Sequence, residues 1–439
     1  MGMPADMGEE SLPATTRAKN ASGRDGATDH CCPAIRWRRF RRSAHFHLRR
    51  IGRRACRPLH VDWRALRVKW RAKGGIMAHH FCNGIPPMNI DTDLPVMVTG
   101  ATGYVAGWLV QRLLEAGVTV HAAVRDPDSP DKLEHLQRIA AGKPGTLRYF
   151  RADLLEPGSY ADAMAGCGTV FHTASPFTVT VRDPQKELVD PALLGTRNVL
   201  ETANRTPSVR RVVLTSSCAA IYGDNADLAA TPDGVFTEAI WNTSSSLTHQ
   251  PYSYSKTVAE REAWKIARQQ QRWDLVTINP SLVIGPGINP YATSESFEIV
   301  RQMGNGTMKA GVPDLGPGAV DVRDVADAHL RAAFLPNANG RYIVSAHDTN
   351  LPAMAATLLE RYGADYPIPR RILPKWLVWL IGPLANKSVT RRVVARNIGL
   401  PWRADNSRSR NELGMRYRPL AESMNDFFQQ LVETGQLQR

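Results

Sequence analysis

Short apolar segments alternate with amphipathic helical segments from position 95 onward. Apolar residues dominate 95–99 and 118–125, and between them Val105, Leu109 and Leu113 recur at the spacing of one helix face. The same alternation continues along the chain. We expect strands at 95–99, 118–125, 146–153, 169–175, 210–217 and 274–284, and helices at 105–116, 132–141, 184–204 and 252–271. This order predicts an α/β fold, a Rossmann-type doubly wound parallel sheet.

The alternation stops after Gly287. We expect the inserts 224–250 and 288–320, together with most of 348–439, to form a smaller C-terminal substrate lobe. Such a lobe would cover the carboxyl ends of the strands, where ligands bind in folds of this kind. The predicted domains are 94–287 for dinucleotide binding, with the insert 224–250, and 288–439 mainly for the substrate lobe, with 321–346 returning to the Rossmann core.

The first 93 residues are basic and lack periodicity. Residues 1–87 carry 18 Lys and Arg against six Asp and Glu, so +12 of the net charge of +14 lies there. We expect this extension to be disordered, and we favour its interpretation as upstream sequence ahead of a natural start at Met77 or Met88. A nucleic-acid-binding arm and a transit peptide are the alternatives. The rest of the chain is nearly neutral, so we expect no nucleic-acid binding by the body of the protein.

The cysteines and the apolar segments bear on the compartment. Only Cys167 and Cys218 lie outside the basic extension, which is typical of a cytoplasmic protein without structural disulfides. No Cys or His spacing fits a standard zinc site, so we expect no metal. No apolar run reaches the length of a membrane-spanning helix. The short apolar segment 376–384 is expected in the core or in a wall of the substrate pocket; the alternative is that it rests on a membrane surface.

A glycine-rich turn joins the first predicted strand to the first helix. Gly100 and Gly103 frame it as Gly-x-x-Gly-x-x-Ala, with Ala106 or Gly107 at the helix-packing position. Glycine permits the tight turn and lets backbone N–H groups approach a pyrophosphate at the helix N-terminus. The predicted cofactor-binding residues of this turn are Gly100, Thr102, Gly103, Tyr104 and Val105.

Arg125 closes the second predicted strand, at the position where an enzyme that prefers NAD carries Asp or Glu. A guanidinium there matches a 2′-phosphate instead, so we expect NADP(H) to be preferred. Lys132 would supply a second cation, and Asp153 and Leu154, after the third strand, are placed to touch the adenine. Asp126 keeps the use of NAD(H) open.

Tyr252 and Lys256 lie four residues apart at the start of the helix that follows 210–217, so they share one helix face. The ammonium, with the positive nicotinamide, is expected to lower the pKa of the phenol toward the working range. Ser217, at the end of the preceding strand, can bind a substrate carbonyl oxygen. Tyr254 is a rival tyrosine, but no lysine lies four residues beyond it. These residues predict hydride transfer on a small carbonyl or alcohol substrate.

Together the motifs resemble the extended short-chain dehydrogenases/reductases of the NAD-dependent epimerase/dehydratase superfamily. The branch they resemble holds dihydroflavonol reductases, cinnamoyl-CoA reductases and aldehyde reductases. The matching segments include Val98-Thr-Gly-Ala-Thr-Gly-Tyr-Val-Ala106, Tyr252-Ser-Tyr-Ser-Lys256-Thr-Val-Ala-Glu260 and Val322-Arg-Asp-Val-Ala-Asp-Ala-His329. The resemblance implies a catalytic triad of Ser217, Tyr252 and Lys256, and further cofactor contacts at Thr173, Ala174, Ser175, Pro280 and Val283.

The Asn-Trp-Tyr-Cys-Tyr signature of cinnamoyl-CoA reductases is replaced here by His249-Gln-Pro-Tyr-Ser-Tyr254, so their substrate is not carried over. The sequence thus predicts an NADP(H)-dependent carbonyl, aldehyde or ketone reductase, as a monomer or homodimer. The alternatives are an NAD-dependent sugar-nucleotide epimerase or dehydratase, a hydroxysteroid dehydrogenase-like enzyme, and a non-catalytic NADP sensor. Arg125 weighs against the epimerase, and the pair Tyr252 and Lys256 weighs against the sensor.

Overall fold

The computed structural model describes residues 88–438 except 176–180 and 293. Within these residues, seven parallel strands form one sheet in the order β10-β6-β5-β4-β1-β2-β3. The strands are β1 (Val96–Thr99), β2 (Val120–Val124), β3 (Leu147–Arg151), β4 (Thr169–His172), β5 (Arg211–Thr215), β6 (Asp274–Pro280) and β10 (Gly340–Val344). The strand order reverses direction at β1, which lies between β2 and β4. In open α/β sheets, this reversal is where ligands bind beyond the carboxyl ends of the strands.

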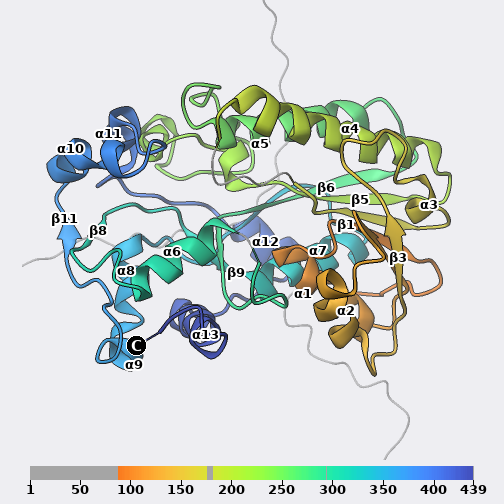
Figure 1. Cartoon of the computed structure of the whole chain (residues 1–439). Helices are drawn as coiled ribbons and strands as arrows, with labels where there is room; N and C mark the ends of the chain where they lie inside the picture. The colour runs from red at the N-terminus through yellow and green to blue at the C-terminus, as the bar shows by residue number, and fades with distance from the viewer. Residues whose placement is uncertain (1–87, 176–180, 293, 439) are drawn as a thin grey trace, which may run out of the picture. The chain divides into compact units, whose positions relative to one another are not determined.

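Helices cover both faces of the sheet (Figure 1). One layer holds α1 (Tyr104–Glu115), α2 (Pro130–Ala140) and α7 (Val322–Phe334); the other holds α4 (Asp190–Arg205) and α5 (Pro251–Ala267), with the short α3 (Ala161–Met164) near α4. The central strands β1, β2 and β4 are buried along their whole length, as expected for a sheet covered on both faces. The predicted Rossmann-type doubly wound fold is confirmed.

A second group of elements follows β6 and shares a core of its own. The core joins α6 (Glu295–Gly304), β8 (Val312–Pro313), α8 (Leu351–Ala356), α9 (Leu359–Tyr362) and α13 (Leu420–Glu433). Phe297, Phe427 and Phe428 are buried at its centre. Three more short helices, α10 (Lys375–Ala385), α11 (Arg391–Asn397) and α12 (Ser407–Glu412), and the strand β11 (Ile372–Leu373) complete the C-terminal part of the chain.

Two predicted elements are divided in the structure. The expected strand 274–284 ends at Pro280, and β7 (Leu282–Ile284) then pairs with β9 (Ala319–Asp321) outside the main sheet. Proline lacks the N–H that a central strand needs, so the ladder stops there. The expected helix 184–204 starts as a π-helical turn over Gln185–Val189, and the regular helix α4 follows with Pro191 in its first turn.

Candidate active site

The glycine turn after β1 has a geometry that requires glycine at its first position. Gly100 has φ +60°, and a Cβ on it would lie 3.0 Å from the Cα of Ala174. Its N–H donates to the carbonyl of Ala123 at 3.1 Å, which fixes the turn beside the end of β2. Gly103 in turn donates to the carbonyl of Gly100 at 2.8 Å. Both the backbone conformation and the close approach of Ala174 therefore exclude a side chain at Gly100.

The N-terminus of α1 faces out of this turn with its backbone donors available. Gly103, the N-cap, is exposed and extended, no side chain caps the helix, and its first turn carries no acidic residue. The first N–H groups of a helix lack partners inside the helix, and the helix dipole favours an anion there. Thr102, half-buried, lies beside them. This uncapped end fits the pyrophosphate of a dinucleotide.

Two of the residues predicted for cofactor binding turn their side chains away from the turn. The hydroxyl of Tyr104 donates to the carbonyl of Gly285 at 2.5 Å, and its ring meets Phe297 edge-on. Val105 packs against the main core. Only the backbone N–H groups of Tyr104 and Val105 can serve a ligand at the helix end.

Arg125 follows β2 directly, two residues beyond the carbonyl that holds Gly100. Its side chain is exposed, and it forms no ion pair within the described part of the chain. Lys132 is exposed as well, but its ammonium lies 3.3 Å from the carboxylate of Asp126. Arg125 is thus the cation that is free to meet a phosphate at this edge.

Asp153 and Leu154 lie two and three residues after β3, at the same edge of the sheet. The Asp153 carboxylate accepts the backbone N–H of Leu155 at 2.9 Å. Leu154 packs closely over Gly195 of α4, where a Cβ would lie 2.9 Å from its side chain. Asp153 is therefore held in a local turn, and Leu154 closes one side of a cavity described below.

Thr99, a residue that the sequence analysis missed, organises the segment after β4. Its hydroxyl oxygen lies within hydrogen-bond distance of the His172 ring at 3.0 Å and accepts the N–H groups of Thr173 and Ala174 at 3.1 and 3.0 Å. The hydroxyl of Thr173 donates back to the carbonyl of Thr99. These bonds hold 173–175 against the glycine turn. Its position directly before Gly100 was the available signal.

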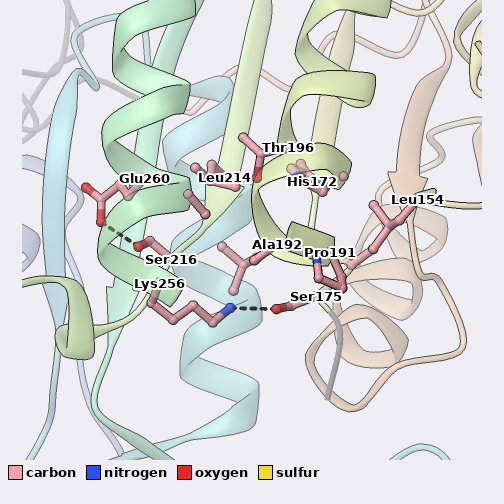
Figure 2. Close-up of a pocket in the computed structure, with 14 residues that line it drawn as sticks. Leu154, His172, Ser175, Pro191, Ala192, Thr196, Leu214, Ser216, Lys256 and Glu260 are labelled. Carbon is pink, nitrogen blue, oxygen red and sulfur yellow. Dashed lines mark hydrogen bonds between the residues drawn. The ribbon is translucent and has the colours of Figure 1, made fainter. Parts of the chain in front are cut away.

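The three predicted catalytic residues come together beside this segment. The side chain of Ser217 accepts the N–H of Ala219 at 3.1 Å and lies near enough to the Tyr252 hydroxyl to act on its pKa, which it lowers. The Lys256 ammonium lies 5.8 Å from the centre of the Tyr252 ring and donates to the hydroxyl of Ser175 at 2.9 Å. Figure 2 shows this last bond between α5 and the segment after β4.

The chain enters α5 through a strained residue that sets the position of Tyr252. Gln250 is, among the described residues, the non-glycine residue with positive φ, at 54°, and Pro251 then starts the helix. The buried ring of His249 contacts the Asp224 carboxylate at 2.8 Å, which anchors the preceding loop. Strained backbone of this kind persists only where its surroundings enforce it, and it clusters at functional sites. Tyr252 consequently stands in the first turn of α5.

Burial has the largest influence on the pKa values of Tyr252 and Lys256. Tyr252 is 42% exposed, yet burial of its hydroxyl end and the Glu295 carboxylate raise its pKa to about 12. Burial lowers the pKa of Lys256 to about 8, against the opposing effect of the Glu260 carboxylate. The expected lowering of the phenol pKa by the ammonium and the positive nicotinamide concerns the cofactor-bound protein and stays a prediction; in the protein by itself, desolvation is the largest influence on the phenol.

A buried carboxylate behind Lys256 was also missed. Glu260 is 1% exposed, accepts from the Ser216 hydroxyl at 2.5 Å and from Asn279 at 2.8 Å, and meets the Arg341 guanidinium at 2.6 Å. It ties α5 to the ends of β5 and β6. A glutamate four residues after Lys256 on the same helix face was the only sequence signal.

A cavity of about 20 Å³ lies between α4, α5 and the ends of β4 and β5 (Figure 2). Its lining includes Leu154, His172, Ala174, Ser175 and Lys256. It has room for water only. Burial, with the Lys256 charge, lowers the pKa of His172 to about 3, so the His172 ring in the lining is neutral.

Two of the residues predicted for cofactor binding lie outside this lining. Pro280 is buried at the end of β6, and Val283 is half-buried in β7.

Comparisons with known proteins match both the sheet and the second core. The sequence profile of the NAD dependent epimerase/dehydratase family matches residues 96–344. The chain is 43% identical over 272 residues to cinnamoyl-CoA reductase CAD2 of Medicago truncatula, covering 61% of this chain and 80% of that protein. It is 36% identical over 346 residues to tetraketide alpha-pyrone reductase 1 of Arabidopsis thaliana, covering 78% and 96%.

The fold resembles that of yeast methylglyoxal/isovaleraldehyde reductase Gre2, solved in complex with NADPH. The TM-score is 0.62 at 25% identity, and the match covers 78% of this chain and 99% of the yeast chain.

Proposed function

The chain belongs to the NAD dependent epimerase/dehydratase family, and from that premise we propose that it is an NADP(H)-dependent carbonyl reductase with Ser217, Tyr252 and Lys256 as its catalytic residues. The predicted family and the class of NAD(P)-dependent oxidoreductase are confirmed by the reductases among its relatives. The plant substrates of those relatives are not assigned to this chain.

The single observation that carries the proposal is the placement of Lys256, whose ammonium lies 5.8 Å from the centre of the Tyr252 ring and donates to Ser175 beside the glycine turn. A dinucleotide held along this turn would place its nicotinamide end toward α5, since its pyrophosphate fits the N-terminus of α1. The bound cofactor supplies the hydride for reduction, or accepts it for oxidation. NADP(H) is favoured because Arg125 is exposed directly after β2, where its guanidinium could bind a 2′-phosphate.

The chain's own residues would handle the oxygen and the proton. Ser217 would donate to the carbonyl oxygen and hold it against Tyr252. The Tyr252 hydroxyl, which is protonated at neutral pH, would give its proton to that oxygen as negative charge develops there. Lys256, charged at neutral pH, would stabilise the phenolate that remains. Oxidation of an alcohol runs the same proton transfer backwards.

The decisive variant is Tyr252→Phe, with Tyr254→Phe as its matched control. We expect Tyr252→Phe to lower kcat by about 10²–10⁴-fold, the usual contribution of general acid catalysis, and Tyr254→Phe to keep kcat near the parent value. The assay follows NADPH absorbance with a panel of aldehydes, diketones, hydroxysteroids and flavonoids. Full turnover by Tyr252→Phe would contradict the mechanism, and tightly bound NAD⁺ in the purified protein would favour the epimerase alternative.

A further inference from the structure

The helix α10 presents most of its apolar side chains to solvent. Leu384 is 87%, Trp376 67% and Leu380 52% exposed. Within α10, only Val378 and Gly382 are buried. Of the two expected places for this segment, the core is therefore wrong, and the wall of the substrate pocket stays a prediction.

The exposed residues lie on one side of a helix that is attached by its other side. Trp376, Leu380 and Leu384 follow each other at intervals of four residues, so they form one stripe along α10. Val378 packs in a small cluster with Val394 of α11. None of the helices in the described part of the chain is long and apolar enough to cross a membrane. The stripe can therefore lie along an apolar boundary, but it cannot span one.

The segment that carries this stripe has charges of one sign only. Between Tyr366 and Ala404 the chain has eight Lys and Arg and no Asp or Glu. Seven of these cations are exposed, namely Arg370, Arg371, Lys375, Lys387, Arg391, Arg392 and Arg403. The Arg391 guanidinium lies 4.4 Å from the centre of the Trp379 ring, which is itself 41% exposed. Aromatic rings beside cations at the edge of an apolar stripe are typical of helices that lie in the headgroup region of a bilayer.

From this arrangement we propose that the outer face of α10 and α11 docks on an anionic lipid surface, with Trp376, Leu380 and Leu384 entering the acyl boundary. A second copy of this face is a poorer partner, because a symmetric contact would place the same cations opposite one another. Residues 1–87 are a poorer partner as well, because their own net charge is +12. Anionic headgroups complement both the stripe and its cationic rim.

The test is cosedimentation of the full chain with vesicles of phosphatidylcholine, alone or mixed with phosphatidylserine. One variant removes the stripe (Trp376→Ser with Leu380→Ser), and another reverses two cations (Arg391→Glu with Arg392→Glu). Leu194→Ser, at a residue of α4 that is 50% exposed, and Arg210→Glu, at an exposed cation outside α10 and α11, are the matched controls. Since residues 1–87 are basic in all of these proteins, only the difference between parent and variant is read.

We expect the parent to bind the anionic vesicles more tightly than the neutral ones. Each Lys or Arg near an anionic surface contributes about fivefold to partitioning, so the charge-reversal variant should bind about 25-fold more weakly or worse. The stripe variant should lose at least about tenfold from its buried apolar area, while both controls bind like the parent.

The proposal is wrong if the parent does not bind the anionic vesicles more tightly than the neutral ones, or if both variants bind the anionic vesicles as the parent does. It is also wrong if the variants leave vesicle binding unchanged and abolish instead a concentration-dependent dimer in sedimentation velocity, or the binding of an acidic protein. Urea unfolding midpoints report whether each variant is folded. The charge-reversal pair, being exposed, still decides the matter if the stripe variant fails to fold.

Discussion

Neutralising Glu260 should weaken the fold and the site at once. In Glu260→Gln, the amide would present its N–H₂ group to a pocket where Arg341, Asn279 and the indole of Trp264 all donate. Arg341 is 7% exposed, so its charge would stay buried without a carboxylate. Removing one partner of a buried ion pair typically costs about 3–5 kcal/mol. That is a large share of the roughly 5–15 kcal/mol by which domains are stable.

The same substitution should also change the pKa of Lys256, because the two side chains interact electrostatically. The Glu260 carboxylate raises the pKa of Lys256, against the burial that lowers it to about 8. Without that carboxylate the pKa should fall further, so Lys256 would lose its proton at lower pH. If the phenolate of Tyr252 needs a charged Lys256, the alkaline limb of the kcat profile should move toward neutral pH.

The free energy of unfolding in urea measures the first effect, and a pH profile of NADPH oxidation measures the second. Glu298→Gln is the matched control, because Glu298 pairs with Arg301 while both side chains are nearly half exposed, which limits its cost to about 1 kcal/mol. The double variant Glu260→Gln/Arg341→Met should lose less than the sum of the single losses, because it leaves no charge unpaired. A loss for Glu260→Gln no larger than that of the control, with additive single changes, would refute the buried-pair reasoning.

Three further predictions concern the cofactor edge, the lysine and the thiols. Arg125→Glu should raise KM for NADPH about 10–100-fold, the loss of a charged hydrogen bond, and change KM for NADH little; an unchanged preference would mean that Arg125 does not read the 2′-phosphate. Because the pKa of Lys256 falls from 10.5 when unfolded to about 8 when folded, its burial penalty is present below pH 8 and relieved as the pH rises toward 10.5. The free energy of unfolding of the parent, measured in urea relative to that of Lys256→Met, should therefore be higher at pH 10.5 than at pH 8. Burial raises the pKa of Cys167 to about 12 and also that of Cys218, so alkylation followed by peptide mass analysis should find both unmodified until the chain unfolds.

Most of the fold could be predicted from local sequence patterns. A central parallel strand is an uninterrupted apolar run, and a helix beside it repeats every three or four residues, so β1, α1 and β2 could be located from single segments. Gly100 and Arg125 could be found in the same way, since each stands directly after a strand. The breaks at Pro280 and Pro191 had local signals too, but the continuous apolar pattern outweighed them in our prediction.

Features that depend on distant partners could not be read from such patterns. Glu260 meets Arg341 across 81 residues, and nothing near either residue indicates the other. The pKa of Tyr252 depends on how much protein surrounds its hydroxyl and on Glu295 of α6, which is far from α5 in the sequence. The apolar segment in α10 is a second case in which the sequence pattern alone was not enough. Apolar composition indicates that a surface avoids water, but whether the chain itself covers it depends on the elements packed nearby, and α11 covers only one side. Residues 366–404 contain no acidic residue, and a buried core needs no such excess of cations. The exposed apolar side therefore favours an anionic partner.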